Sequence, residues 1–203
     1  MKPYSESCER NQGPILKILQ EVLTDQQCVL EIASGTGQHA VYFGHALPHL
    51  SWQTSELAQN HEGILAWLNE IKLPNVLPPI IIDVNDAKWP IEIVDTVFNA
   101  NMVHIISWPE VERLFAGITR VLNANGILCL YGPFKYEGKF TSESNARFDA
   151  LLRSRDSNSG IRDFEAINRL AEMHGLFLVK DVAMPSYNQT LIWQRTPRIL
   201  KTP

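Results

Sequence analysis

The stretch that decides the fold is Cys28-Val-Leu-Glu-Ile-Ala-Ser-Gly-Thr-Gly-Gln-His-Ala-Val-Tyr-Phe43. Its first five residues form an apolar run typical of a strand, the glycines Gly35 and Gly37 interrupt it, and the remainder has the spacing typical of a helix. Glycines let backbone N–H groups approach a nucleotide-type ligand, and the N-terminus of a helix adds favourable polarity. A glycine pair after a strand also occurs in ordinary tight turns, so this stretch alone leaves both interpretations open.

An acid after the next predicted strand favours the ligand site. Residues 51–54 have the pattern of a short strand, and Glu56 follows at its end. Glu56 lies about 20 residues beyond the glycines, the spacing at which a carboxylate accepts hydrogen bonds from ribose hydroxyls in a βαβ nucleotide-binding unit. Most glutamates are merely solvated, but this position favours a role in binding.

The composition is that of one ordinary globular domain. With 203 residues, of which 45% are hydrophobic and 20% charged, the chain can bury one good core, and we expect a single domain over 1–203. The net charge of −4 and the pI near 5.9 argue against broad binding to nucleic acid or to anionic membranes. The longest apolar runs, such as 77–82, are too short to span a bilayer.

The cysteines and the first residues bear on location. No apolar region typical of a secretory signal follows residues 1–6. The chain has an odd number of cysteines, namely Cys8, Cys28 and Cys129, and two of them lie inside predicted apolar strands. We interpret them as buried thiols in a reducing compartment, without a disulfide framework or a metal cluster, and we expect the protein in the cytoplasm.

Apolar periodicity predicts alternating helices and strands. Pro14 suits the first turn of the helix expected at 15–23. A polar insertion is expected at 134–159, after the fifth strand, with a short helix around 148–152. Helices are expected at 15–23, 64–71, 111–122 and 164–173, and strands at 28–32, 51–54, 78–84, 96–100, 127–131, 176–183 and 189–195.

The last two predicted strands give the best topological clue. Only residues 184–188 separate them, and a parallel crossover needs about a dozen residues or more, so these strands should be antiparallel neighbours. The earlier strands alternate with helices and should be parallel. The sequence therefore predicts a mostly parallel α/β sheet whose last strand is antiparallel.

This arrangement and the motifs together resemble the class I S-adenosylmethionine-dependent methyltransferases. The run Glu31-Ile-Ala-Ser-Gly35-Thr-Gly37 resembles their first motif, with Ala33 where a glycine is usual. The resemblance implies a Rossmann-like sheet of seven strands with helices on both faces, and S-adenosylmethionine as the cofactor. It implies a cofactor-binding set made of Glu31, Ala33, Ser34, Gly35, Gly37, Glu56, Leu57, Asp83, Val84, Asn99 and Asn101, with Arg10 and Asn11 in an N-terminal lid segment, 1–13, that closes over the cofactor.

A narrower resemblance covers about residues 7–195. It is to a small methyltransferase-like family of unassigned function found in bacteria and animals. In that family Ala-Asn-Asn tends to follow Met184-Pro185, whereas this chain has Ser186-Tyr187-Asn188, which puts a transfer of substrate choice from relatives in doubt. The resemblance is carried by Cys8-Glu-Arg-Asn11, Gly37-Gln-His-Ala40, Trp52-Gln53, Asn101-Met-Val-His104, Tyr131-Gly-Pro-Phe134, Ser144-Asn145, Phe148-Asp149, Gly160-Ile-Arg-Asp163 and Met184-Pro185.

Methyl transfer from a sulfonium depends mainly on positioning, so the sequence needs no catalytic triad. Ligands of open α/β sheets lie beyond the carboxyl ends of the strands. His104 is the candidate base because its ordinary pKa is near neutrality, and the alternative is a structural histidine that caps backbone near a helix start. Tyr131 is a second candidate catalytic residue, with a core ring as the alternative. Asn145, Arg162 and Tyr187 are the candidate substrate-binding residues, with a plain salt bridge as the alternative for Arg162.

Three functions follow from these patterns. The first is a methyltransferase acting on an unidentified small molecule, without nucleic acid or membrane as partner. The second is a protein that binds S-adenosylmethionine or S-adenosylhomocysteine without turnover. The third, a nicotinamide oxidoreductase, is suggested by 35–40 and by the pair Tyr131 and Lys135, but Gly132-Pro133 between them forbids the helix that such a pair needs. We therefore reject the third. His39 and His45 are expected to decorate the surface of the helix after the glycines.

Overall fold

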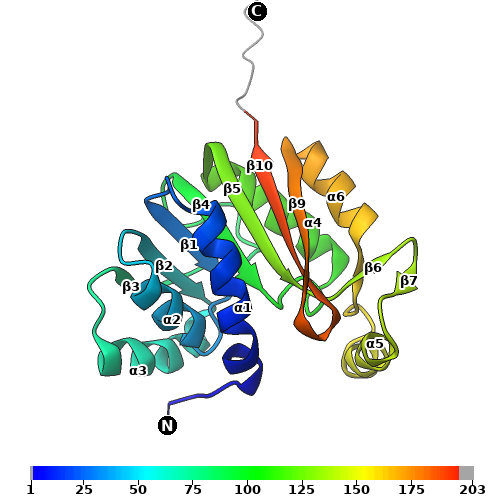
Figure 1. Ribbon diagram of the computed structural model, residues 1–203, viewed down its shortest axis with the longest axis horizontal. Coiled ribbons are helices and arrows are strands. Elements are labelled where there is room, and N and C mark those ends of the chain that lie inside the picture. Colours follow the sequence, from blue (N-terminus) through cyan, green and yellow to red (C-terminus); the bar gives the residue numbers. More distant parts are fainter. Residues whose placement is uncertain (1, 197–203) are drawn as a thin grey trace, which may run out of the picture.

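The computed structural model describes residues 2–196 and contains one central sheet of seven strands (Figure 1). The strand order is β3-β2-β1-β4-β5-β10-β9. The strands are β1 (Cys28–Ile32), β2 (Ser51–Glu56), β3 (Val76–Ile81), β4 (Val94–Ala100), β5 (Leu122–Gly132), β9 (Leu176–Met184) and β10 (Asn188–Arg195).

Strand β10 is inserted antiparallel between β5 and β9, whereas the pairings among β1, β2, β3, β4 and β5 are parallel. A turn of three residues, Pro185–Tyr187, joins β9 to β10. The predicted mostly parallel sheet with an antiparallel last strand is therefore confirmed. Because the parallel strands run in one direction, their carboxyl ends meet at a single edge of the sheet, where a ligand site is expected.

Helices cover both faces of the sheet and build two cores. On one face α1 (Glu6–Val22) and α2 (Gln38–Ala46) pack against β1, β4 and β5, and Trp52 and Phe98 lie in that core. On the other face α4 (Trp108–Val121) and α6 (Phe164–Met173) enclose Trp193 and Phe115. Helix α3 (His61–Ile71) lies beside the edge strand β3. Burying the large aromatic side chains on both faces fixes the sheet as the rigid frame of the site.

The first helix begins earlier than predicted. We expected it from Pro14, but α1 begins at Glu6, so residues 6–13 of the predicted lid segment 1–13 are helical. Ser5 caps it, since its Oγ accepts a hydrogen bond from the Cys8 N–H, and Glu6 and Glu9 place negative charge in the first turn. These features stabilise a polar helix start, and Pro14 lies inside the helix at the expense of one backbone N–H.

The insertion after β5 is more ordered than predicted. It contains β6 (Phe134–Tyr136), β7 (Lys139–Phe140) and α5 (Glu143–Arg155), a longer helix than the one expected at 148–152, and β8 (Arg162–Asp163) completes a small second sheet of order β7-β6-β8. Figure 1 shows α5 at the same lower edge of the molecule as the start of α1 and the turn between β9 and β10. These three segments enclose the carboxyl ends of β4 and β5.

The third strand also differs from its prediction. We expected it to reach Asp83 and Val84, but β3 ends at Ile81, and Asp83 lies in the following loop. Pro78 and Pro79 are tolerated because β3 is an edge strand and its pairing with β2 is irregular opposite them, between Gln53 and Ser55. In residues 2–196 no helix is long and apolar enough to cross a membrane.

Candidate functional site

A cavity of about 520 Å³ lies at the carboxyl ends of β1, β4 and β5. Five segments form its walls: the start of α1, the glycine turn after β1, the residues after β4 and β5, α5, and the turn before β10. The polar side chains lining it include Arg10, Asn11, Ser34, His39, Asn101, His104, Tyr131 and Asn145. It therefore brings together residues from both ends of the chain at the place predicted for a ligand.

The glycine turn after β1 has the backbone conformation that a close approach requires. Ala33, Gly35 and Gly37 all have positive φ, at 56°, 56° and 87°. The Ser34 N–H donates to the Ser55 carbonyl at 2.9 Å, which ties the turn to the end of β2. A Cβ on Gly37 would lie 3.1 Å from the Ile64 Cα on α3, so this position has little room for a side chain. The turn is thus held rigidly at the N-terminus of α2.

Ala33 occupies a left-handed conformation that glycine adopts more easily. Replacing Ala33 by glycine is expected to raise the free energy of unfolding by about 1 kcal/mol, because it relieves strain of about 1–3 kcal/mol at the expense of a smaller backbone entropy. Urea unfolding measures this difference. As a matched control, Ala40→Gly in the buried first turn of α2 should lower the free energy of unfolding. A loss of stability in Ala33→Gly would contradict this assignment of strain.

The Glu56 carboxylate lies directly against the glycine turn. Its Oε2 accepts the Gly35 N–H at 3.0 Å, and its Oε1 accepts the Leu57 N–H at 2.9 Å. Each carboxylate oxygen has two acceptor sites, so one site on each oxygen stays available for a ribose hydroxyl. Glu56 does not line the 520 Å³ cavity, although Gly35, which it contacts, does.

Glu31 is buried beneath the turn and does not line the cavity. Its Oε2 accepts a hydrogen bond from Trp52 Nε1 at 3.0 Å. Burial raises the pKa of Glu31 to about 7, against the lowering effect of the Trp52 hydrogen bond, and the nearby Glu56 charge adds to the rise. The structure therefore places Glu31 beneath the turn, where it contacts Trp52 and not the cavity.

The remaining residues predicted for the adenosine part lie outside the cavity. Asp83 is half-buried, and its Oδ1 accepts the Asn85 N–H at 2.8 Å in a local turn. Val84 is buried in the core near β4. Asn99 is fully buried, and its amide donates to the Ile32 carbonyl at 2.8 Å, which links β4 to β1. Asn99 therefore links two strands of the sheet, and its contact with the cofactor stays a prediction.

Asn101 and His104 follow β4 and line the cavity. Asn101 has a φ of 61°, and its N–H donates to the Tyr131 carbonyl at 2.8 Å. His104 is 2% exposed, and within residues 2–196 its Nδ1 has no hydrogen-bond partner. Burial, with a smaller effect of the Arg162 charge, lowers the pKa of His104 to about 4. The ring is therefore neutral at pH 7 and carries an unused polar atom.

Two of the three predicted substrate-binding residues lie away from the cavity. The Arg162 guanidinium donates to the carbonyls of Val103, at 3.0 Å, and of Ile106, so it braces the segment after β4. The Nε and Nη2 donors of Arg162 are thus used by backbone carbonyls, and its contact with a substrate stays a prediction. The Tyr187 side chain is exposed and does not line the cavity, and its backbone carbonyl accepts the Asn145 amide at 3.0 Å. Asn145 does line the cavity, as predicted.

A family model described as "Protein of unknown function (DUF938)" matches residues 2–195. The chain belongs to the DUF938 family. This match covers nearly the whole chain and names no reaction.

Solved structures share the fold of the DUF938 chain. An O-methyltransferase family protein from Burkholderia thailandensis has a TM-score of 0.83 at 15% identity, over 95% of this chain and 58% of its own. Human N-acetylserotonin methyltransferase, in complex with S-adenosylmethionine, has a TM-score of 0.80 at 11% identity, over 95% of this chain and 53% of its own. An O-methyltransferase family 2 protein from Planctomyces limnophilus, in complex with apigenin, has a TM-score of 0.78 at 15% identity, over 94% of this chain and 60% of its own. The predicted Rossmann-like class I methyltransferase fold is confirmed, and the chain spans little more than half the length of these proteins.

His39 is the cavity residue of the DUF938 chain that sequence reasoning missed. We expected it on the helix surface, but it is 5% exposed and lines the cavity, whereas His45 is exposed. The His39 ring stacks on Phe43 with 5.2 Å between the ring centroids, and its Nε2 lies 2.7 Å from Asn11 Oδ1. Its partner is 28 residues away in the sequence, so no local pattern indicates this contact.

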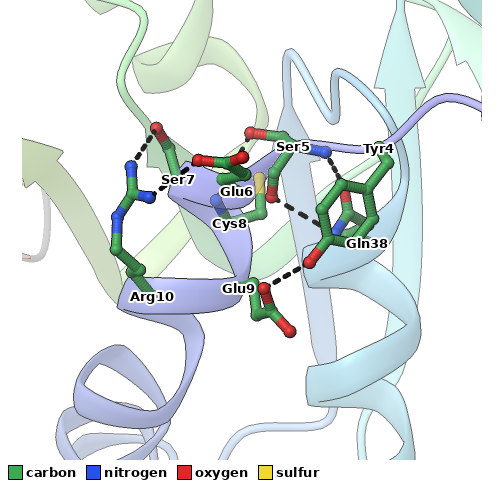
Figure 2. A network of polar contacts seen from close by, with 8 residues as sticks. All are labelled: Tyr4, Ser5, Glu6, Ser7, Cys8, Glu9, Arg10 and Gln38. Atoms are coloured by element: carbon green, nitrogen blue, oxygen red, sulfur yellow. Dashed lines mark hydrogen bonds and ion pairs between the residues drawn. The ribbon is translucent and has the colours of Figure 1, made fainter.

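The start of α1 is fastened to the glycine turn by a polar network (Figure 2). The Gln38 side chain accepts the Ser5 N–H through Oε1, at 2.5 Å, and donates through Nε2 to the Ser5 carbonyl at 3.3 Å. Thr36 Oγ1 donates to the same Oε1 at 3.0 Å. Arg10 extends from the helix on the side away from Gln38 and is paired with Glu6 at 3.1 Å. The wall of the cavity formed by α1 is thus anchored while Arg10 stays exposed.

Proposed function

We propose that the chain is an S-adenosylmethionine-dependent methyltransferase that acts on a small molecule. One observation carries this proposal: the Glu56 carboxylate contacts the glycine turn through Gly35, at the edge of the sheet where the 520 Å³ cavity opens. A carboxylate in this position with spare acceptor sites is what two ribose hydroxyls require. The fold shared with methyltransferases supports the same conclusion.

The residues around the turn fit the cofactor. Glu56 would hold the ribose hydroxyls, and the backbone of Ala33, Ser34, Gly35 and Gly37 would lie against the sugar and the methionine part. Leu57, Asp83 and Val84 lie after β2 and β3 on the Glu56 side and would flank the adenine. Asn101, Arg10 and Asn11, on the cavity side, would contact the methionine part. Glu31 would support the turn from below.

When bound, the cofactor supplies an electrophilic methyl group on a positively charged sulfur. The protein's own contribution is to hold the acceptor in line and to manage its proton. His104 lines the cavity as a neutral ring whose Nδ1 has no partner in the described chain. It would accept a hydrogen bond from the O–H or N–H of the acceptor. Because burial lowers its pKa, it would take up that proton only as the acceptor becomes positively charged on bonding to the methyl group. Tyr131 and Asn145, which also line the cavity, would hydrogen-bond polar groups of the bound molecules.

A small-molecule acceptor suits the size and lining of the cavity. Its volume of about 520 Å³ is within the range of small-ligand sites. The side chains opposite the glycine turn include Ile105, Pro133 and Phe148, which offer apolar contact to a compact acceptor. The net charge of −4 disfavours a polyanionic substrate.

The proposal is tested by calorimetric titration of the protein with S-adenosylmethionine, S-adenosylhomocysteine and NADH in parallel. We expect both adenosyl compounds to bind with dissociation constants in the micromolar range and NADH not to bind. A subsequent screen of small acceptors, with release of S-adenosylhomocysteine as the readout, separates an enzyme from a protein that only binds the cofactor. Binding of NADH alone would overturn the proposal.

A further inference from the structure

A chain of three buried polar side chains runs from α2 through α1 to β5 along one wall of the cavity. It consists of His39, Asn11 and Tyr131, which are 5%, 8% and 4% exposed, and all three line the cavity. They come from segments far apart in the sequence and meet only in the fold. Buried polar groups with defined partners fix the direction of each hydrogen bond.

The direction of the first hydrogen bond follows from chemistry. Burial lowers the pKa of His39 to about 4, so the ring is neutral at pH 7 and carries a single N–H. Its Nε2 lies 2.7 Å from Asn11 Oδ1, and an amide oxygen can only accept. The hydrogen of His39 is therefore on Nε2. Stacking on Phe43 at an interplanar angle of 15° holds the ring in this orientation.

The direction of the second hydrogen bond, between Asn11 and Tyr131, follows from that of the first. Because Asn11 Oδ1 accepts from His39, the Asn11 amide presents its N–H₂ to other partners. Asn11 and Tyr131 line the same cavity, and with Oδ1 engaged by His39 the Asn11 amide meets the phenolic oxygen as an N–H donor. A hydrogen bond with Asn11 accordingly lowers the pKa of Tyr131 against the larger rise that burial causes. The Tyr131 oxygen is then an acceptor toward Asn11, and its own hydrogen turns away from Asn11. Within the described chain no hydrogen bond takes up that hydrogen.

We propose that His39 and Asn11 are positioning residues that direct the Tyr131 hydroxyl hydrogen into the cavity, where it donates to the carboxylate of the methionine part of the bound cofactor. This inference rests on the proposed function, since it assumes an adenosyl ligand in the site. The exposed Arg10 guanidinium lines the same cavity and supplies positive charge for the same anionic group. Its pair with Glu6 is exposed on both sides and is easily exchanged for a ligand.

The first test compares two ligands that differ in the methionine part. S-adenosylhomocysteine has the carboxylate, and 5′-methylthioadenosine lacks it together with the rest of the amino-acid group. Tyr131→Phe should weaken S-adenosylhomocysteine binding by about 10-fold or more, the usual loss for a hydrogen bond to a charged group. It should change the affinity for methylthioadenosine by less than about 2-fold, since that ligand has no carboxylate to lose a donor. The matched control is Tyr136→Phe, whose hydroxyl donates to Asp181 outside the cavity and should affect neither ligand.

A pair of His39 variants tests the positioning role. His39→Phe keeps an aromatic ring against Phe43 but removes the donor to Asn11. The freed amide oxygen can then accept the Tyr131 hydrogen, so the S-adenosylhomocysteine affinity should fall about as far as in Tyr131→Phe. His39→Gln restores an N–H donor near the place of Nε2 and should recover most of the affinity. Added to Tyr131→Phe, His39→Phe should cause no further loss, because both act on one hydrogen bond.

The outcomes are separable. Equal losses for both ligands in the variants, or equal effects of His39→Phe and His39→Gln, would mean a structural role and would overturn the proposal. A wild-type protein that binds neither ligand would instead refute the proposed function. NMR of the ligand-free protein tests the hydrogen-bond direction independently: we expect neutral His39 with its hydrogen on Nε2 at pH 7. A hydrogen on Nδ1, or a charged ring, would overturn the inference whatever the ligand.

Discussion

Replacing Glu56 by glutamine is expected to weaken binding of S-adenosylhomocysteine by about 100-fold or more. The amide keeps the shape of the side chain but removes the negative charge and one acceptor oxygen. Two hydrogen bonds from ribose hydroxyls to a carboxylate are each worth about 1.5–3 kcal/mol, and the substitution weakens both. This is the largest effect on binding that the structure predicts for one side chain, because Glu56 also holds the Gly35 N–H of the turn.

Calorimetric titration of the variant measures this effect, and circular dichroism shows whether the fold is kept. The matched control is Glu62→Gln on the exposed first turn of α3, which changes the net charge equally and should leave the affinity within about 2-fold. Unchanged affinity in Glu56→Gln would refute the ribose assignment. Asp83→Ala tests the adenine side in the same way, with a smaller expected loss because Asp83 is only half-buried.

Replacing Glu31 by glutamine is expected to stabilise the ligand-free protein at pH 8 and to do so much less at pH 4.5. Burial raises the pKa of Glu31 from an ordinary 4.5 to about 7 in the folded state. Below pH 4.5 the carboxyl group is protonated in both states and contributes nothing. As the pH rises from 4.5 to 7, the unfolded chain ionises first, and the folded state loses relative stability until both states are ionised.

The expected size follows from the two pKa values. Their difference corresponds to about 3 kcal/mol at pH values above 7. Glutamine keeps an oxygen that accepts the Trp52 N–H and carries no charge to desolvate. Urea unfolding of both proteins between pH 4.5 and 8 should show a stability gap that grows with pH. A gap that is constant over this range, as we expect for the exposed Glu62→Gln, would contradict the assignment.

The parts of the site that could be predicted from the sequence are those encoded in short, contiguous patterns. The glycine turn after β1, Glu56 after β2 and the short antiparallel connection before β10 each need only local spacing to be recognised. The last of these fixed the class of sheet, because five residues cannot carry a parallel crossover. The start of α1 at Glu6 could not be predicted, because the polar residues before Pro14 show no apolar periodicity, although Ser5 and the first-turn acids stabilise a helix there.

Residues whose roles depend on distant partners could not be predicted. Arg162 has the spacing and chemistry of an anion-binding residue, but the Val103 carbonyl that takes its donor lies 59 residues away in the sequence. His39 was interpreted as a surface residue because a histidine near a helix start gives no sign of burial. Its contact with Asn11 exists only once α1 packs across α2. Sequence spacing therefore predicts a role for Glu56 and the glycine turn, and only the fold reveals the polar residues of the cavity.

The antiparallel insertion of β10 has a consequence for the order in which the molecule can assemble. Strand β9 joins the main sheet only through β10, and β10 is synthesised after β9 and after every other strand of the sheet. Until it emerges, β5 has an unpaired edge, and the core that will bury Trp193 is open. A nascent chain can therefore pair β1 to β5 early, but the sheet is complete only after residues 188–195 have been synthesised. Until then the unpaired edge of β5 is exposed to pairing with other chains.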